Sequence, residues 1–134
     1  MKRSFLLFVV VLMLTLSGCS MVSRERVKLK DLEMTILSEE VIAQELMTIL
    51  DEKKEKAFQF TYTDKEYLYI CIGYGKQDTG GYSIAVDELY QTEDAIYIST
   101  SLLGPGETEK GATAPSYPYI VVRVENLKLP VIFE

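Results

Sequence analysis

The chain has 134 residues, with 14 basic and 20 acidic side chains, a formal net charge of −6 and no histidine. An acidic chain lacks the basic face that binds nucleic-acid phosphates, so we expect no nucleic-acid partner. The lack of histidine removes the commonest general base at neutral pH and the commonest transition-metal ligand. We therefore expect no enzymatic activity, no metal and no cofactor.

Residues 1–18 have the features of a bacterial lipoprotein signal peptide. Lys2-Arg3 precedes an almost unbroken apolar run of 12 residues from Phe5 to Leu16, and two small residues stand directly before Cys19. A membrane-spanning helix needs roughly 20 apolar residues, which disfavours a retained anchor. We expect cleavage before Cys19, lipidation of that cysteine, including palmitate, and anchoring to the extracytoplasmic face of the cell membrane. In a two-membrane cell the anchor would also suit the outer membrane.

Residues 19–37 are expected to form the lipidated tether. Cleavage would leave 116 residues with a net charge of −8, a length that fits one domain and a short leader. The stretch from Ser20 to Lys30 has four basic residues and one acid. Two interpretations stay open, a solvated spacer and adhesion to anionic headgroups at about 1 kcal/mol per basic residue.

A helix is predicted at residues 39–56, at the start of a domain spanning 38–134. Ser38 suits the N-cap, and Glu39 and Glu40 suit the first turn. Apolar residues then recur at helical spacing, namely Ile42, Leu46, Ile49 and Leu50. We expect this apolar stripe to pack on the domain's own sheet, with binding to a partner as the alternative.

The region 58–134 is predicted to be rich in β-structure, because aromatic and β-branched residues alternate between turn-forming residues. The predicted strands are 58–63, 66–74, 81–91, 95–102, 118–126 and 130–134. Thr63-Asp64-Lys65 predicts a tight turn, so the first two strands should form a hairpin. The expected fold is α+β and mainly antiparallel, a small β-sandwich or barrel of about six strands closed at one end by the helix.

Few residues suit chemistry. Cys71 is the one candidate nucleophile left, but its neighbours are apolar and offer no base, so we expect a packed structural thiol. With Cys19 acylated, Cys71 would also have no partner for an intramolecular disulfide. Asp87-Glu88 and Glu93-Asp94 resemble the carboxylate pairs of glycosidases or calcium sites, but adjacent acids at strand ends usually face water. We assign them no catalytic role.

Two loops form the predicted binding surface. The first contains a double glycine directly before a tyrosine, and glycines permit close backbone approach. The second is long and ends in an aromatic pair braced by prolines, which is typical of recognition loops. The candidate binding residues are Gly80, Gly81, Tyr82, Gly104, Pro105, Gly106, Pro115, Tyr117 and Tyr119.

If the strands simply run up and down, both loops lie at the same end of the domain and can be neighbours. Exposed tyrosines suit a contact surface because they bury a large area with few rotors to freeze. Tyr82 and Tyr119 are equally compatible with the core, whereas Tyr117, between a serine and a proline, is predicted to be the most exposed.

These loops and their strands resemble the PrcB C-terminal domain. The similarity runs from roughly Tyr67 to Glu125 and is carried by three pieces, Gly80-Gly81-Tyr82-Ser83-Ile84, Gly104-Pro105-Gly106 and Ala114-Pro115-Ser116-Tyr117-Pro118-Tyr119. The family is named for a lipoprotein subunit of a bacterial surface protease complex. The resemblance therefore implies a non-catalytic accessory role, with a secreted or surface protease as partner.

Two alternatives remain. Thr79-Gly80-Gly81-Tyr82 is similar to the first loop of chagasin-like inhibitors of cysteine peptidases. The chain departs from that pattern at Gln77-Asp78, where asparagine-proline is expected, and it has no tryptophan for the third loop. The other alternative is a structural envelope lipoprotein without a protease partner.

Overall fold

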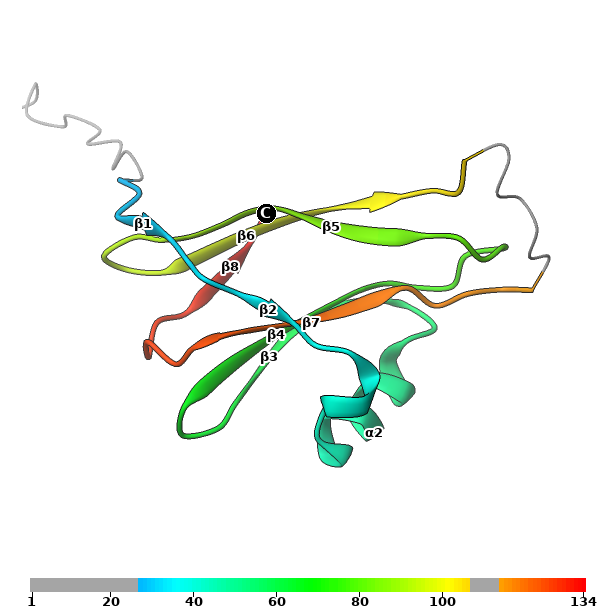
Figure 1. Ribbon diagram of the computed structural model, residues 1–134, viewed down its shortest axis with the longest axis horizontal. Helices are drawn as coiled ribbons and strands as arrows, with labels where there is room; N and C mark the ends of the chain where they lie inside the picture. Colours follow the sequence, from blue (N-terminus) through cyan, green and yellow to red (C-terminus); the bar gives the residue numbers. More distant parts are fainter. Residues whose placement is uncertain (1–26, 107–113) are drawn as a thin grey trace, which may run out of the picture.

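The computed structural model describes residues 27–106 and 114–134, which form two four-stranded sheets and one α-helix (Figure 1). The strand orders are β1-β5-β6-β8 and β2-β7-β4-β3. The strands are β1 Lys30–Asp31, β2 Thr35–Ile36, β3 Ala57–Thr63, β4 Tyr67–Tyr74, β5 Ser83–Gln91, β6 Ile96–Leu103, β7 Tyr119–Glu125 and β8 Val131–Phe133. A 3-10 turn, Glu39–Val41, precedes the helix α2, Gln44–Lys53. Cys19 and residues 107–113 lie outside the described residues.

The predicted mainly antiparallel fold is confirmed. Each of the six predicted strands is present, with bounds within two residues of those expected, and β3 and β4 form the predicted hairpin. The sheets lie face to face as a sandwich, so the barrel alternative is wrong (Figure 1). One pairing departs from the antiparallel pattern, because β8 runs parallel to β6.

The chain before the helix adds two strands that no sequence pattern predicts. β1 pairs with β5, and β2 pairs with β7, so residues 30–36 cross from one sheet to the other. Part of the stretch assigned to the tether therefore belongs to the sandwich. Strands of two residues are too short to show the alternation by which strands are recognised in a sequence.

The helix begins later and ends earlier than the predicted 39–56. Ser38 makes no side-chain capping hydrogen bond, and Ile42 is extended, with φ −75° and ψ 132°. Ile42 is 8% exposed and belongs to the core, so its insertion beneath the helix interrupts the helical backbone. The continuous helix then begins at Gln44.

Two hydrophobic clusters lie on opposite faces of the β2-β7-β4-β3 sheet. The first fills the space between the sheets and includes Ile70, Ile98 and Val122. The second lies under α2 and includes Leu46 and Leu50 of the helix. Burying a side chain of this size contributes roughly 1.5–3 kcal/mol to folding. The prediction that the helix packs on the domain's own sheet is confirmed. The expectation that it closes one end of the sandwich is wrong, because α2 covers the outer face of the β2-β7-β4-β3 sheet (Figure 1).

Connections between strands gather at two ends of the sandwich. The turn end contains residues 64–66, 92–95 and 126–130, and the loop end contains residues 75–82, 104–106 and 114–118. The first described residues lie at the turn end, because the Leu29 N–H donates to the Gln91 carbonyl at 2.8 Å. Figure 1 shows this separation, with β1 entering on one side and the loops on the other. In the described part of the chain, no helix is long and apolar enough to cross a membrane.

Candidate binding surface

The loop end brings the two predicted loops together. Gln77 and Ser116 exchange two backbone hydrogen bonds, of 2.8 and 3.0 Å, across the start of the first loop and the end of the second. The Ser116 hydroxyl also donates to the Thr79 carbonyl at 2.6 Å. These bonds hold Ser116, the residue before Tyr117, against the first loop, so the two segments form one surface.

The glycines of the first loop allow a second contact between the loops. Gly81 has φ +87°, and a Cβ built on it would lie 2.9 Å from Cβ of Pro105. A Cβ built on Gly104 would lie 3.6 Å from the Tyr82 ring. Only a residue without a side chain allows the backbone at Gly81 to approach Pro105 this closely. The prediction that the two loops are neighbours is confirmed.

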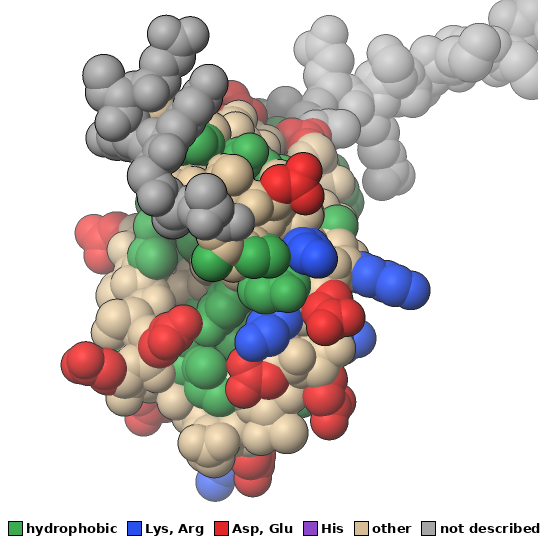
Figure 2. Space-filling model, turned by 90° about the vertical axis from the view of Figure 1, so that its right-hand side faces the viewer, with side chains coloured by type: hydrophobic (Ala, Val, Ile, Leu, Met, Phe, Trp, Pro, Cys, Tyr) green, Lys and Arg blue, Asp and Glu red, His purple; other side chains and the backbone are tan. Residues whose placement is uncertain are grey.

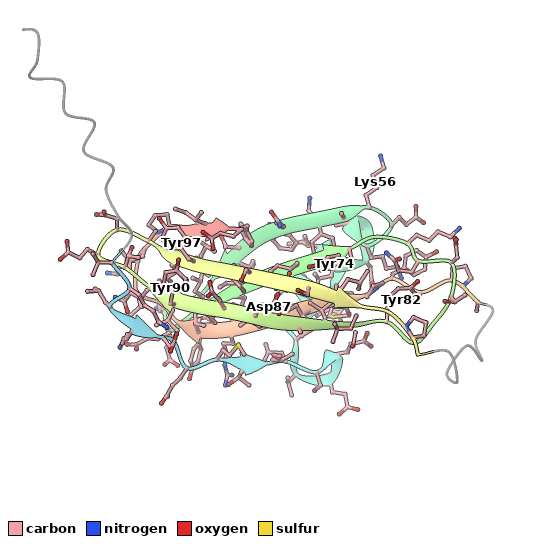
Figure 3. All side chains as sticks on the ribbon, turned by 90° about the horizontal axis from the view of Figure 1, so that it is seen from above. Lys56, Tyr74, Tyr82, Asp87, Tyr90 and Tyr97 are labelled. Atoms are coloured by element: carbon pink, nitrogen blue, oxygen red, sulfur yellow. The ribbon has the colours of Figure 1, made fainter. Side chains whose placement is uncertain are left out.

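All three candidate tyrosines, Tyr82, Tyr117 and Tyr119, are half-buried, so the expectation that Tyr117 is the most exposed of them stays a prediction. The Tyr117 ring lies beneath the Lys54 ammonium, with Nζ 5.4 Å from the ring centroid. A cation over an aromatic face is attracted by the ring quadrupole, and this contact covers part of the ring. Tyr82 lies at the same end of the molecule (Figure 3). Pro115 and Gly106 are exposed beside them.

Tyr119 is held more firmly than its neighbours. Its hydroxyl donates to the Glu39 carboxylate at 3.0 Å, and its ring packs against the cluster under α2. Burial, reinforced by the Glu39 carboxylate, raises the pKa of Tyr119 to about 12. Tyr119 is therefore an anchoring residue that stays neutral at physiological pH.

A shallow hollow of about 270 Å³ adjoins Tyr117 and Tyr119. One wall comes from the chain between β2 and the 3-10 turn, and the other from the start of β7. The lining residues are Ile36, Leu37, Ser38, Glu39, Tyr117, Pro118, Tyr119, Ile120 and Val121. Ile36 is 50% exposed, so the hollow offers apolar surface that an apolar group of a bound protein could cover.

Figure 2 looks onto the loop end. Apolar side chains lie together there, with lysine and acidic side chains around them, so the face does not carry charge of one sign. Aromatic and apolar groups rimmed by mixed polar groups are the usual make-up of a protein-binding surface. The surface suits recognition of a protein.

Cys71, the candidate nucleophile of the sequence, is not placed for catalysis. Cys71 is fully buried in the cluster under α2, as predicted, and burial raises the pKa of its thiol to about 12. A nucleophilic cysteine needs the opposite shift. Within residues 27–106 and 114–134, no group of three or more Cys, Asp or Glu side chains is placed to hold a metal ion.

Two contributors to this surface were not recognised in the sequence. Lys54 directly follows the helix α2, and its ammonium lies over the Tyr117 ring. Glu39 was assigned to the first helical turn, whereas its carboxylate accepts the Tyr119 hydroxyl hydrogen bond. Both contacts join residues far apart in sequence, and no local pattern signals them.

A comparison with protein families matches residues 68–125 to the family described as PrcB C-terminal. The matched segment starts at the second residue of β4 and ends with the last residue of β7, so it contains both loops. The resemblance inferred from the sequence is confirmed over almost the same range. Searches among curated proteins and among solved structures found no significant match.

Proposed function

We propose that this chain is a non-catalytic accessory module that binds a secreted or surface protease, because residues 68–125 match the PrcB C-terminal family. The family suggests association with a protease complex. The proposal assigns the chain the task of holding or assembling that protease.

The meeting of the loops at one end of the sandwich carries this proposal. Two hydrogen bonds between Gln77 and Ser116 and the close approach of Gly81 to Pro105 hold the surface in one shape before a partner arrives. A surface that is already ordered loses less conformational entropy on binding. Tyr82, Tyr117 and the exposed Pro115 are the proposed contact residues, with Gly80, Gly104 and Gly106 shaping the loops around them.

Anchoring through a lipid on Cys19 is the second part of the proposal. Val27, the first described residue, follows Cys19 by eight positions, and eight extended residues span at most about 26–29 Å. Since Leu29 lies at the turn end, a short tether would hold that end near the membrane. The loop end would then point away from the bilayer, towards a partner on the cell surface.

The partner is tested by crosslinking the lipoprotein in intact cells and capturing it. The wild-type chain should enrich a protease, Tyr117→Ala should lose it, and Glu93→Ala, an exposed change at the turn end, should keep it. If no protease is enriched above the background, the accessory role is wrong and a structural envelope role is the better description.

The anchor is tested separately by fractionation. Cys19→Ser should move the protein from the membrane fraction to the soluble fraction. Because this readout does not involve the partner, membrane retention of the variant would contradict the lipid anchor alone.

A peptidase inhibitor is the second candidate, favoured by the clustering of a glycine-tyrosine loop and a proline-tyrosine loop at one end. Inhibitors of the chagasin type present their loops in this manner. Adding the purified chain to the captured protease distinguishes the two roles. Loss of peptidase activity at stoichiometric amounts supports inhibition, and unchanged or increased activity supports an accessory subunit.

A further inference from the structure

The strand β3 forms an open edge of the sandwich. It pairs with β4 along its whole length and, in the described part of the chain, with no other strand. Figure 3 shows it along one margin of the molecule, opposite the margin formed by β1 and β2. An unpaired strand edge presents backbone donors and acceptors that another strand can bind.

The hydrogen-bond pattern identifies which residues face outward. The Asp64 N–H donates to the Tyr67 carbonyl at 3.0 Å, so these two residues form a hydrogen-bonded pair of the antiparallel ladder. Such pairs occur at every second residue. Phe58, Phe60 and Tyr62 therefore bond to β4, and the backbone groups of four residues point away from it. Those residues are Ala57, Gln59, Thr61 and Thr63, and their side chains are all exposed.

This edge lacks the features that usually block strand addition. Residues 57–63 contain no charge, no proline and no register shift. The opposite margin is protected, because β1 and β2 cover parts of β5 and β7, and β5 has a bulge between Val86 and Glu88. Bulges and charged residues are common ways of blunting an edge. β3 is thus the longest regular edge without such protection among the described strands.

We propose that two copies of this chain associate by pairing β3 with β3 in an antiparallel manner, about a two-fold axis at Phe60. This register places Ala57 opposite Thr63 of the second copy, and Gln59 opposite Thr61. Each such pair exchanges two backbone hydrogen bonds, so the four pairs make about eight. The two sheets become one continuous sheet, and the contact is isologous, as in most homodimers.

Charges beside the strand favour a second copy as the occupant. The Tyr62 hydroxyl donates to Glu45 at 3.1 Å, and the Lys53 ammonium lies 5.7 Å from the Phe60 ring centroid. The proposed register puts Tyr62 of one copy diagonal to Phe60 of the other, on the same face of the sheet. Glu45 of each copy then lies towards Lys53 of the second copy, so opposite charges meet.

Sedimentation velocity of the full chain in detergent, over a range of protein concentrations, tests the proposal. The wild-type chain should dimerise, and Thr61→Lys should raise the dimer dissociation constant at least tenfold, because it adds a charge to the edge without removing a bond to β4. Ser83→Lys adds the same charge at an exposed position of β5 and should leave dimerisation unchanged. If Thr61→Lys fails to fold, Gln59→Lys replaces it.

A charge exchange tests the register. Glu45→Lys and Lys53→Glu should each weaken the dimer, and the double variant should recover most of the loss. A chain that stays monomeric at every concentration overturns the proposal, as does association that Thr61→Lys leaves intact. The proposal is also overturned if the wild-type chain is a monomer and captures a different protein that Thr61→Lys no longer captures. That result would show that the edge of β3 pairs with a strand of another protein. None of these outcomes depends on the loop end or on the lipid anchor.

Discussion

The two ends of the sandwich are closed in different ways. At the turn end, single side chains complete short turns, as Asp64 does by accepting hydrogen bonds from the backbone N–H groups of Glu66 and Tyr67 at 2.9 and 2.7 Å. Asn126 joins a second turn to the first by donating to the Asp64 carbonyl at 3.1 Å. Asp64 thus closes its own turn through local hydrogen bonds, and Asn126 links this turn to the one at residues 126–130.

The loop end instead depends on contacts between segments far apart in the chain. Ser116 reaches across to Gln77 and Thr79, Gly81 meets Pro105, and Lys54 covers Tyr117. The turn end thus connects neighbouring strands by short turns, whereas the loop end combines several segments into a surface. Recognition residues commonly occupy loops held by a rigid scaffold, and for this reason the loop end is the proposed partner-binding surface.

Gly75→Ala should have the largest effect on stability. Gly75 has φ +76°, and an added Cβ would lie 2.9 Å from the backbone nitrogen of Ala57. Positive φ and a backbone clash together should lower the free energy of unfolding by about 3 kcal/mol. Chemical denaturation measures this change. Gly106→Ala is the matched control, because an added Cβ there meets no atom within 4 Å. Equal stability of the two variants would contradict a rigid base for the loop end.

Gly81→Ala should have a moderate effect that is specific to the loop end. An added Cβ would lie 2.9 Å from Cβ of Pro105, and the alanine backbone would have to adopt φ +87°. The expected loss of stability is about 1–2 kcal/mol. Partner capture should fall more than stability does, because the two loops are pushed apart. Unchanged capture in a stable variant would show that the two loops do not act as one surface.

Asp64→Asn should weaken the turn end and leave partner capture unchanged. Hydrogen bonds from the Tyr67 backbone and the Tyr69 hydroxyl lower the pKa of Asp64. Because the pKa of Asp64 is lowered in the folded state, its ionised carboxylate stabilises the fold at pH values above the ordinary pKa of an aspartate, about 4. This contribution is lost as the pH falls through the folded-state pKa. The variant should therefore melt at a lower temperature than wild type at pH 7, with a difference that shrinks in acid. A constant difference across this range would exclude the carboxylate as its source.

Tyr117→Ala should have the smallest effect on stability. The ring is half-buried and its contact with Lys54 is partly exposed, so the loss should be at most about 1 kcal/mol. Partner capture should nevertheless fall at least tenfold, as for an aromatic contact residue. A thermal melt alongside the capture assay separates the two effects. A fall in stability as large as that of Gly75→Ala would place Tyr117 in the structural core.

Local patterns were sufficient to predict the body of the fold. The strands from β3 to β8 have alternating or continuous apolar residues. The residues around Asp64 have the composition of a tight turn, which predicts that β3 pairs with β4. β1 and β2 were not predicted, because they form by pairing with β5 and β7, which lie far along the chain. The helix start was wrong for a similar reason, because packing of Ile42 in the core outweighs the capping signal at Ser38.

The candidate surface was predictable only in part. The up-and-down order of strands was enough to place the two loops at one end, and glycine and proline marked where they lie. The contact of Lys54 with the Tyr117 ring was not predictable, since Lys54 lies 63 positions earlier in the chain. Residue type and neighbours indicate which side chains suit recognition, but their accessibility is set by tertiary contacts.

Site-specific photocrosslinking in intact cells tests the division between the two ends most directly. A photoreactive residue would replace Pro115 at the loop end or Glu93 at the turn end, both of which are exposed. We predict a covalent adduct with a protease from position 115 and none from position 93. An adduct that forms equally from both positions, or from position 93 alone, would contradict the assignment of the loop end as the partner-binding surface.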